Sequence, residues 1–530
     1  MSEVRALTTA SPNASGAARL VCAGPPSAAA RFRAQLAAEH GDALDWRRET
    51  ITLYDAPDGA LAAAGCAVEL REAGESRRLT AWRDAAGGPS GVHHGALAAN
   101  ASVDVAAFAA RVDDAVFARA FGATDGRLRP RAVAAADVWT RIVRRGRSVV
   151  AVRLEQPLDE RGGLATIAFD SVDGPADAAF DLAAEAAAHG GLRPAADGLV
   201  ARLFAARSDG PPRARIERED TAADALAQGL AASARRVIDL APLLAAARDP
   251  ERARQMRVAL RRFRAYERVF RKGLRTDGLR ELARTAQGFG RLIGAARDWD
   301  VFIGDSLPLV ESRANSSLGA ARLRALCEAR RADAWDEVVA TVDGPAFAAF
   351  SLALLRAARL QEWRADARER LTRPCAEFAP AALDRRFDAA RLAGETAMDG
   401  DPQALHDLRI EIKKLRYAMQ IFRDVLDRKS RKALNARLAA LQDALGAVND
   451  AATADALARA AAAPAVAAER APALVGRALL GAARAAGFVS GYRGAEADLA
   501  VADALPAWRE IAEEPPFWRA DAGADARAAE

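Results

Sequence analysis

Residues Glu251–Arg275 read ERARQMRVALRRFRAYERVFRKGLR, with ten Lys or Arg and only two acids. Apolar residues recur at steps of three and four from Met256 to Leu274, which is the spacing of one face of an α-helix. Cations recur at the same steps on a neighbouring face: Arg254, Arg257, Arg261, Arg264, Arg268, Arg271 and Arg275. The pattern predicts a helix that packs on one side and holds negative charge along a stripe ~31 Å long.

This pattern occurs a second time, 152 positions later (409 − 257 = 152). Leu405–Asp427 reads LHDLRIEIKKLRYAMQIFRDVLD and aligns with the first copy without a gap. The register continues, because Gly294 and Asp298 fall on Gly446 and Asp450. A repeat of this length predicts a duplicated structural unit with a pseudo-twofold arrangement.

Composition and charge place the chain in a broad class. Its 530 residues are enough for several domains, and its net charge is +5. Residues 251–275 contribute +8 and residues 401–432 contribute +4, so the rest of the chain carries −7. Four scattered cysteines favour a reducing compartment, without a zinc site or a disulfide framework. We find no apolar run approaching 18 residues and no signal peptide, and we expect a cytoplasmic protein without a membrane partner.

The order of patterns along the chain predicts an α+β domain with a largely antiparallel sheet, followed by an all-α, duplicated helical-bundle domain. Strands are expected at 50–55, 66–72, 78–84, 148–156 and 164–172, and helices near 27–39, 104–121 and 175–189. The predicted divisions are a disordered stretch 1–16, the α+β domain 17–205, a linker 206–217 containing Gly-Pro-Pro, the helical domain 218–512 and a flexible tail 513–530. Asp249-Pro250 and Asp401-Pro402 precede the repeated helices, as expected of helix starts.

A single basic run is most often a solvated surface that forms salt bridges with its neighbours. Two copies in register, with few acids on the same helices, favour instead a site for a linear polyanion. Arginine, which binds phosphate oxygens in a bidentate manner, predominates on the stripes. Nucleic acid is another polyanion, but the stripes lack interleaved aromatic residues for base stacking, so we regard it as an unlikely partner.

The candidate binding residues lie on the two repeated segments. His406 is either an ordinary histidine near a helix start or a phosphate hydrogen-bond donor, and its counterpart in the first copy is Arg254. The full candidate set is Arg254, Arg257, Arg261, Arg262, Arg264, Arg268, Arg271, His406, Arg409, Lys413, Lys414, Arg416 and Arg423.

Both copies resemble the signature segments of the CHAD domain family. The pattern appears in Gln255–Arg264 and in His406–Arg416, and the segments Ala296–Asp300 and Val448–Asp450 are also similar to the family's. The resemblance covers roughly residues 218–510. It implies two pseudo-symmetric helical bundles around a basic groove that binds inorganic polyphosphate, and association with polyphosphate granules in a bacterial cell. One departure is that Arg254 stands where the family has its first histidine.

The preceding region resembles a CYTH domain, the triphosphate-tunnel fold. The similar segments are Tyr54–Pro57, Val68–Arg71, Thr80–Arg83 and Leu192–Pro194. The family's opening Glu-x-Glu-x-Lys is missing from Ala18–Cys22, and its later acidic strand keeps only Asp170. The resemblance is therefore to a degenerate member, for which we expect no catalytic residue, metal or cofactor.

Three functions remain open for this first domain. The alternative to polyphosphate binding by the helices is a metal-dependent triphosphate or polyphosphate hydrolase. A third possibility is a platform for a protein partner. A group of basic residues either binds a phosphate chain or consists of outward-facing strand arginines: Arg71, Arg83, Arg141, Arg144 and Arg153.

Overall fold

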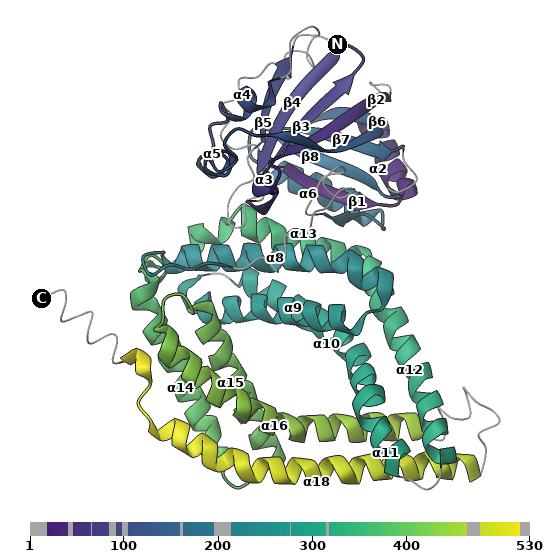
Figure 1. The fold of residues 1–530 in the computed structure, drawn as a ribbon, viewed down its shortest axis with the longest axis vertical. Coiled ribbons are helices and arrows are strands. Elements are labelled where there is room, and N and C mark those ends of the chain that lie inside the picture. The colour runs from purple at the N-terminus through teal and green to yellow at the C-terminus, as the bar shows by residue number, and fades with distance from the viewer. Residues whose placement is uncertain are drawn as a thin grey trace, which may run out of the picture. The chain divides into compact units, whose positions relative to one another are not determined.

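The structure is a computed structural model that describes residues 19–40, 46–64, 66–83, 92–97, 104–158, 163–195, 214–275, 277–313, 317–463 and 477–519 (Figure 1). The chain divides into two compact units. One contains Met1–Arg213, Ala227–Leu243 and Thr341–Glu362, and the other contains Ala214–Leu226, Leu244–Ala340 and Trp363–Glu530.

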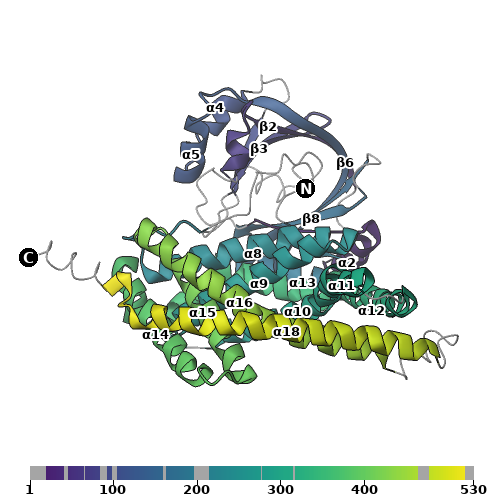
Figure 2. The same cartoon turned by 60° about the horizontal axis from the view of Figure 1, so that its bottom comes forward.

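The first unit is built on a nine-stranded sheet in the order β5-β4-β3-β2-β6-β7-β8-β1-β9. Every neighbouring pair is antiparallel, and the sheet is strongly curved (Figure 2). The strands are β1 (Arg19–Gly24), β2 (Arg47–Asp55), β3 (Cys66–Ala73), β4 (Ser76–Arg83), β5 (Val92–Leu97), β6 (Arg129–Arg145), β7 (Ser148–Pro157), β8 (Ala165–Asp173) and β9 (Arg193–Pro194).

Helices pack on this sheet in two groups. One group contacts the strands β7, β8 and β1 and consists of α2 (Pro26–His40) and α6 (Asp177–Ala188), with α13 (Pro345–Arg359) packed on α6. The other lies near β2, β3 and β4 and consists of α3 (Ala60–Ala63), α4 (Val105–Ala109) and α5 (Ala115–Gly122). Val68 and Leu70 of β3 join the core beneath this second group. Because side chains alternate along a strand, Glu69 and Arg71 point to the opposite face of the sheet.

The five predicted strands are confirmed within β2, β3, β4, β7 and β8, apart from residue 84, which lies outside the described residues. The single helix expected near 104–121 is instead two short helices, each started by an aspartate. Asp104 accepts a hydrogen bond from the Ala107 amide, and Asp114 accepts one from the Phe117 amide.

Four strands were not predicted from the sequence: β1, β5, β9 and the long strand β6. The middle of β6 is rich in alanine, a residue that favours helices. In the structure Ala132, Ala134, Ala136 and Val138 are buried at every second position, on the same side as Ile51. Cross-strand packing, rather than local propensity, therefore decides the structure of this segment.

The second unit is helical. Only the two ends of α8 (Ala222–Ala247) belong to this unit. The other helices are α9 (Pro250–Phe270), α10 (Gly278–Val301), α11 (Leu307–Arg313), α12 (Ser317–Asp343), α14 (Cys375–Ala397), α15 (Pro402–Ile421), α16 (Arg428–Ala462) and α18 (Arg477–Glu513). The predicted duplication is confirmed, because α8, α9 and α10 recur as α14, α15 and α16 with starts offset by 153, 152 and 150 residues.

The predicted starts of the repeated helices are also confirmed. Asp249 caps α9 by accepting a 2.8 Å hydrogen bond from the Glu251 amide, and Asp401 caps α15 through a 2.8 Å bond from the Ala404 amide. A proline follows each cap at the first helical position, where its missing N–H costs no hydrogen bond.

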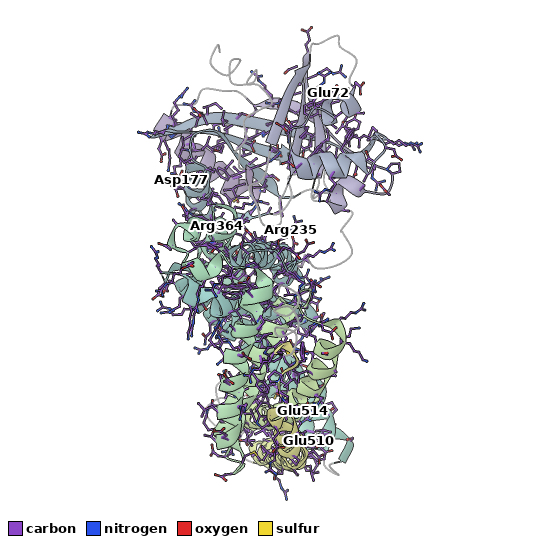
Figure 3. All side chains as sticks on the ribbon, turned by 90° about the vertical axis from the view of Figure 1, so that its left-hand side faces the viewer. Glu72, Asp177, Arg235, Arg364, Glu510 and Glu514 are labelled. Atoms are coloured by element: carbon purple, nitrogen blue, oxygen red, sulfur yellow. The ribbon has the colours of Figure 1, made fainter. Side chains whose placement is uncertain are left out.

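The end of α18 is fixed by specific contacts. Arg437 on α16 binds Glu514, which is labelled with Glu510 in Figure 3. Trp518 is 1 % exposed, and its indole N–H donates to Asp384 on α14 at 2.9 Å. The expected flexible tail from residue 513 therefore does not hold at Trp518, because this aromatic ring is buried and hydrogen-bonded. Among the described helices, none alone is long and apolar enough to cross a membrane; only the bent pair Gly319–Asp343 and Pro345–Arg359 passes that test jointly.

Candidate functional site

The two repeated basic helices pack against each other. Helix α9 contacts α15, α10 packs on α9, and α16 packs on α15. The apolar faces of α9 and α15 are fully buried, with Met256, Phe263, Leu408 and Ile412 each at 0 % exposure. Because each basic stripe flanks such a face, this packing brings cations of both repeats together.

Five of these cations are here called the basic cluster, because the charges of four arginines all act on one lysine: Arg257, Arg261, Arg264, Arg409 and Lys413. Burial, together with the charges of Arg261, Arg409, Arg257 and Arg264, lowers the pKa of Lys413 to about 7. In the described part of the chain, no hydrogen bond or ion pair to the Lys413 ammonium is found. The cluster is thus a concentration of positive charge contributed by both repeats, in which no carboxylate pairs with Lys413 among the described residues.

Two glycines leave room for the cluster's arginines. A Cβ atom added at Gly294 of α10 would lie 3.2 Å from Cζ of Arg257, and one added at Gly446 of α16 would lie 3.8 Å from Nε of Arg409. These are equivalent positions of the two repeats. The lack of a side chain at Gly294 therefore allows the Arg257 guanidinium to lie against α10, whereas a Cβ at Gly446 would make only an ordinary contact with Arg409.

Polar contacts hold other arginines in place on the repeats. Arg264 donates to Gln287 of α10 at 2.9 Å, and its equivalent Arg416 donates to Gln442 of α16 at 2.9 Å. Arg261 donates through Nε to the Arg257 carbonyl oxygen at 3.3 Å. These neutral partners orient the cations without cancelling their charge.

The acidic residues near the cluster are few. Asp298 lies 3.6 Å from Arg257. Burial raises the pKa of Asp298, the Arg257 charge opposes this, and the nearby Asp450 raises the pKa further. Burial is also the largest effect that lowers the pKa of Arg257 and of Arg264, so these guanidinium groups are desolvated. A desolvated cation without a full counter-charge binds an incoming anion strongly.

Carboxylates are more prominent beside Arg268. Burial raises the pKa of Glu267. The charges of several nearby arginines lower it by less, so the pKa is raised overall. The negative charges of Glu267 and Glu411 act on the Arg268 guanidinium. Arg386 of α14 donates to the Arg268 carbonyl oxygen at 3.2 Å, and Arg271 lies within electrostatic range of both arginines. Positive charge therefore continues beyond the basic cluster but is partly neutralised there.

Several candidate residues lie apart from the cluster. Arg254 forms a bidentate pair with Glu251, with both N–O distances at 2.7 Å. Arg262 is turned roughly 100° from Arg261 around α9, and its charge acts on Tyr266.

The remaining candidates belong to the second repeat. Lys414 pairs with Glu411, and Arg423 pairs with Asp424 at 3.1 Å. His406 is partly buried and makes no hydrogen bond or ion pair with the residues that the structure describes.

Three further arginines were missed by the sequence analysis. Arg291 and Arg297 on α10 act on Arg264 and Arg257, and Arg386 comes from α14. None has a cation at the equivalent position of the other repeat, where Asp443, Asn449 and Ala234 stand. The repeated pattern of basic residues therefore could not predict these three arginines.

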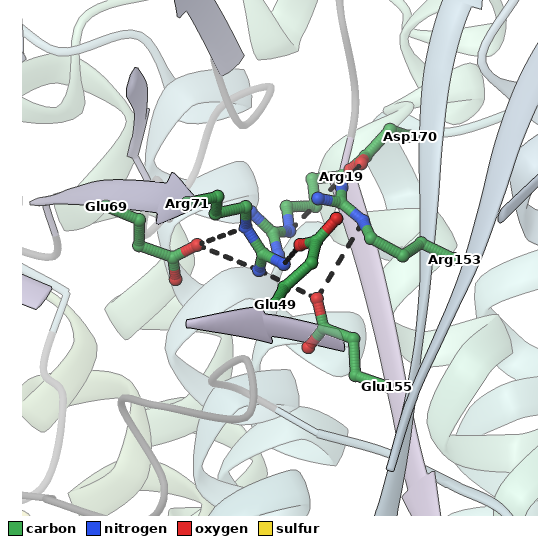
Figure 4. Close-up of polar contacts among 7 residues, drawn as sticks. All are labelled: Arg19, Glu49, Glu69, Arg71, Arg153, Glu155 and Asp170. Atoms are coloured by element: carbon green, nitrogen blue, oxygen red, sulfur yellow. Dashed lines mark hydrogen bonds and ion pairs between the residues drawn. The ribbon is translucent and has the colours of Figure 1, made fainter. Parts of the chain in front are cut away.

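A second charged cluster lies inside the sheet of the first unit (Figure 4). Arg71 contacts three glutamates, at 3.0 Å to Glu69, 2.7 Å to Glu155 and 3.3 Å to Glu49. The guanidinium and these carboxylates are almost fully buried. Burial lowers the pKa of Arg71, but the three carboxylates outweigh burial and raise it overall.

The same network includes Arg153, which pairs with Asp170, and Arg19, whose Nε lies 3.6 Å from Asp170. The interpretation of Arg71 and Arg153 as outward-facing is wrong, because they are only 3 % and 5 % exposed. Arg141 is partly buried and Arg144 is exposed. The side chain of Arg83 lies outside the described part of the structure. Within that part, no group of three or more His, Cys, Asp or Glu residues is placed to hold a metal ion.

These features define a duplicated helical domain with a basic cluster between its repeats. Residues 228–459 match the model of the CHAD domain. The resemblance of the first unit to a CYTH domain stays a prediction.

The solved structures that match the chain include the CHAD domain from the plant Ricinus communis, at 23% identity, a TM-score of 0.46, and coverage of 58% of this chain and 99% of that one. PptA from Streptomyces chartreusis matches at 20% identity and a TM-score of 0.43, covering 55% of this chain and 100% of that one. A candidate adenylate cyclase from Bacillus halodurans matches at 11% identity and a TM-score of 0.23, covering 32% and 88%. No curated protein matches the chain.

Proposed function

We propose that the basic cluster binds inorganic polyphosphate. The observation that carries this proposal is the contact of α9 with α15, across which the charges of Arg257, Arg261, Arg264 and Arg409 all act on Lys413. Among the described residues, the Lys413 ammonium has no acidic partner. The buried Nε of Arg409 also lacks a hydrogen-bond acceptor among the described residues. A chain of phosphates supplies both the charge and the oxygen acceptors that these groups need.

The kind of polyanion follows from what surrounds the cluster. Phe263 and Phe270 on α9 are fully buried in the core, so their rings are not available to stack on bases. Arginine forks suit phosphate oxygens, and each contact releases a condensed counter-ion. These features favour a phosphate chain over RNA or DNA. Association with polyphosphate granules in the cytoplasm is part of the proposal.

A titration of the full-length protein with polyphosphate at several salt concentrations tests the proposal. We expect tight binding whose logarithmic affinity falls linearly with the logarithm of the salt concentration. An RNA of matched charge should bind more weakly at every salt concentration. Equal affinity for both polymers would indicate a general polyanion site, and binding that is insensitive to salt would contradict the proposal.

The alternative function was hydrolysis of triphosphate or polyphosphate by the first unit. Asp170, which the resemblance suggested as a remaining catalytic carboxylate, faces Arg153 and Arg19. We therefore expect no substantial phosphate release from tripolyphosphate with Mg²⁺ or Mn²⁺. Strong metal-dependent release that Asp170→Ala abolishes would establish the alternative.

A further inference from the structure

We propose that the polyphosphate site continues along α16 to a further subsite formed by Arg428 and Arg431. The inference deepens the proposed function and rests on it. It starts from the side of α16 that lies against the basic stripe of α15.

Three positions on α16 define this side of the helix. A Cβ atom added at Gly446 would lie 3.8 Å from Nε of Arg409. Arg416 donates to Gln442 at 2.9 Å and to Asn435 at 3.3 Å. Steps of seven and four residues place the three positions on one side of α16. This side therefore follows the cations of α15 from Arg409 to Arg416.

Two arginines continue the same side toward the start of α16. Arg431 precedes Asn435 by four residues, and Arg428 precedes Arg431 by three. Arg428 is exposed and Arg431 is partly buried. Helix α18 contacts a different side of α16 at this level, because Arg437, which binds Glu514, is turned roughly 160° from Asn435. The two arginines therefore extend the basic stripe of α15 onto α16.

The described residues do not neutralise these two arginines. Within the described ranges, no carboxylate forms an ion pair with Arg428 or Arg431, and the buried Nε of Arg431 has no hydrogen-bond acceptor. The adjacent Asp427 caps α16 by accepting a 2.7 Å hydrogen bond from the Ser430 amide. Cations in the first turn also oppose the helix dipole, so they do not stabilise α16 by themselves. A bound phosphate chain supplies the negative charge and the acceptors that both side chains need.

The first repeat has no such extension. The equivalent of Arg431 on α10 is Leu279, which is apolar and only 5 % exposed. Arg280 beside it is exposed but pairs with Asp277 at 2.9 Å. A chain that leaves the basic cluster is therefore held farther along the second repeat than along the first.

The position of the subsite sets the length of chain that can use it. Between Gly446, which lies against Arg409, and Arg431 the helix rises ~22 Å. Tripolyphosphate is too short to contact the basic cluster and the two arginines together. The subsite should therefore strengthen the binding of long chains and leave the binding of tripolyphosphate at the cluster unchanged.

The test measures both ligands by calorimetry on the full-length protein and on the double variant Arg428→Gln with Arg431→Gln. For long-chain polyphosphate, each lost phosphate contact should reduce the affinity by about 5-fold at about 0.1 M salt, or about 25-fold for both. The log–log salt dependence should flatten by about 1.4. The affinity for tripolyphosphate should not change. Arg428→Gln alone, at an exposed position, should lose about 5-fold, so the test does not depend on how the protein tolerates a change at Arg431.

A matched control removes the same charge away from this side of α16. It combines Lys429→Gln, which is turned roughly 120° from Asn435, with Arg284→Gln on α10, where Arg284 pairs with Glu281 at 2.7 Å. This variant should bind both ligands like the wild type.

Three outcomes would overturn the subsite, and they are distinguishable. Equal losses in the control and in the Arg428 and Arg431 variant would assign the effect to net charge. Wild-type affinity for long chains in the latter variant would refute the extension and leave polyphosphate binding at the basic cluster intact. A wild-type protein that binds no polyphosphate would refute the proposed function as well.

Discussion

Phe270 and Phe422 occupy equivalent positions of the two repeats, and their rings contact each other with centroids 5.9 Å apart. Two further pairs of equivalent residues interact electrostatically across the repeats. Arg261 acts on Lys413, and Asp450 acts on Asp298. Equivalent residues meet only near the axis that relates two copies. The pseudo-twofold axis therefore passes through the contact of α9 with α15, and the basic cluster lies on it.

The first prediction is that both repeats act on one ligand. Arg257→Gln with Arg261→Gln, and separately Arg409→Gln with Lys413→Gln, should each strongly reduce polyphosphate affinity. Each lost phosphate contact should also flatten the salt dependence by about 0.7 in log–log slope if the ligand behaves like a single strand. Arg262→Gln with Lys414→Gln is the control. Calorimetry showing half the stoichiometry with unchanged affinity in the first two variants would reject the shared site.

The second prediction concerns the two glycines under the arginines. Gly294→Ala crowds the guanidinium of Arg257 at 3.2 Å, whereas Gly446→Ala makes only ordinary contact with Arg409 at 3.8 Å. Both changes should favour the helix, by up to about 1 kcal/mol each. Polyphosphate affinity should fall a few-fold in Gly294→Ala, about 0.5–1 kcal/mol, and stay unchanged in Gly446→Ala. Thermal unfolding and a binding titration on both variants check this, and an equal loss of affinity would show that the closer contact is unimportant.

The third prediction is a pH dependence of binding that arises from Lys413. Its pKa of about 7 is below the ordinary value because of burial and the four arginines, and a bound polyanion should raise it again. The bound state then takes up a proton, so affinity should rise as pH falls from about 8 to 6, by at most about 10-fold per pH unit. Lys413→Arg keeps the charge and should remove this dependence. An unchanged dependence in that variant would assign the titration to another group.

The same pKa has the opposite consequence for stability. Between the folded value of about 7 and the higher unfolded value, the unfolded chain binds more protons at Lys413 than the folded chain does. The contribution of Lys413 to the free energy of unfolding should therefore rise with pH across this window. Lys413→Gln should flatten the rise in a series of thermal unfolding curves, and a steeper rise would contradict this assignment.

The fourth prediction tests the charged network inside the sheet. Arg71→Gln removes the closest cation of the buried Glu49, Glu69 and Glu155, with Arg153 still 3.8 Å from Glu155, and should destabilise the first unit by about 3–5 kcal/mol. Arg48→Gln breaks only the exposed pair with Asp137 and should change stability by less than about 1 kcal/mol. Urea unfolding of both variants provides the comparison. Similar small effects would mean that the glutamates are protonated or reach water in the folded protein.

Acid should act on the same network. Burial raises the pKa of Glu69, but Arg71, Arg19 and Arg153 outweigh it and lower the value overall. Glu69 therefore contributes stability above its unfolded pKa, and this contribution is lost as pH falls through the lower folded value.

The sequence was sufficient to predict the structure where the basic pattern repeats. The gapless offset between the basic segments predicted α9 and α15, their caps and five members of the basic cluster. It could not show that Arg261 belongs to the basic cluster and the adjacent Arg262 does not. Which side of the helix faces the other repeat depends on how the helices pack. Arg386 was missed because Ala234 stands at the equivalent position.

The charged network in the sheet was beyond sequence reasoning for a different reason. Arg71 pairs with Glu49 and Glu155, which lie on other strands far along the chain. A charged residue on a strand is predicted to be solvent-exposed unless its cross-strand neighbours are known. The register of the sheet, which no local pattern contains, turns these residues into a buried ion-pair network.

The pseudo-twofold axis through the basic cluster also bears on the direction of a bound chain. A site built from two equivalent halves presents nearly the same charges to a polymer that enters from either end. Inorganic polyphosphate has identical ends, so both orientations are the same complex, whereas RNA and DNA have distinct 5′ and 3′ ends. Glu267 and Glu411 break the equivalence, because Met419 and Ala259 stand at their counterpart positions. Under the proposed function, a polymer with identical ends would make the same contacts on the axis in either orientation.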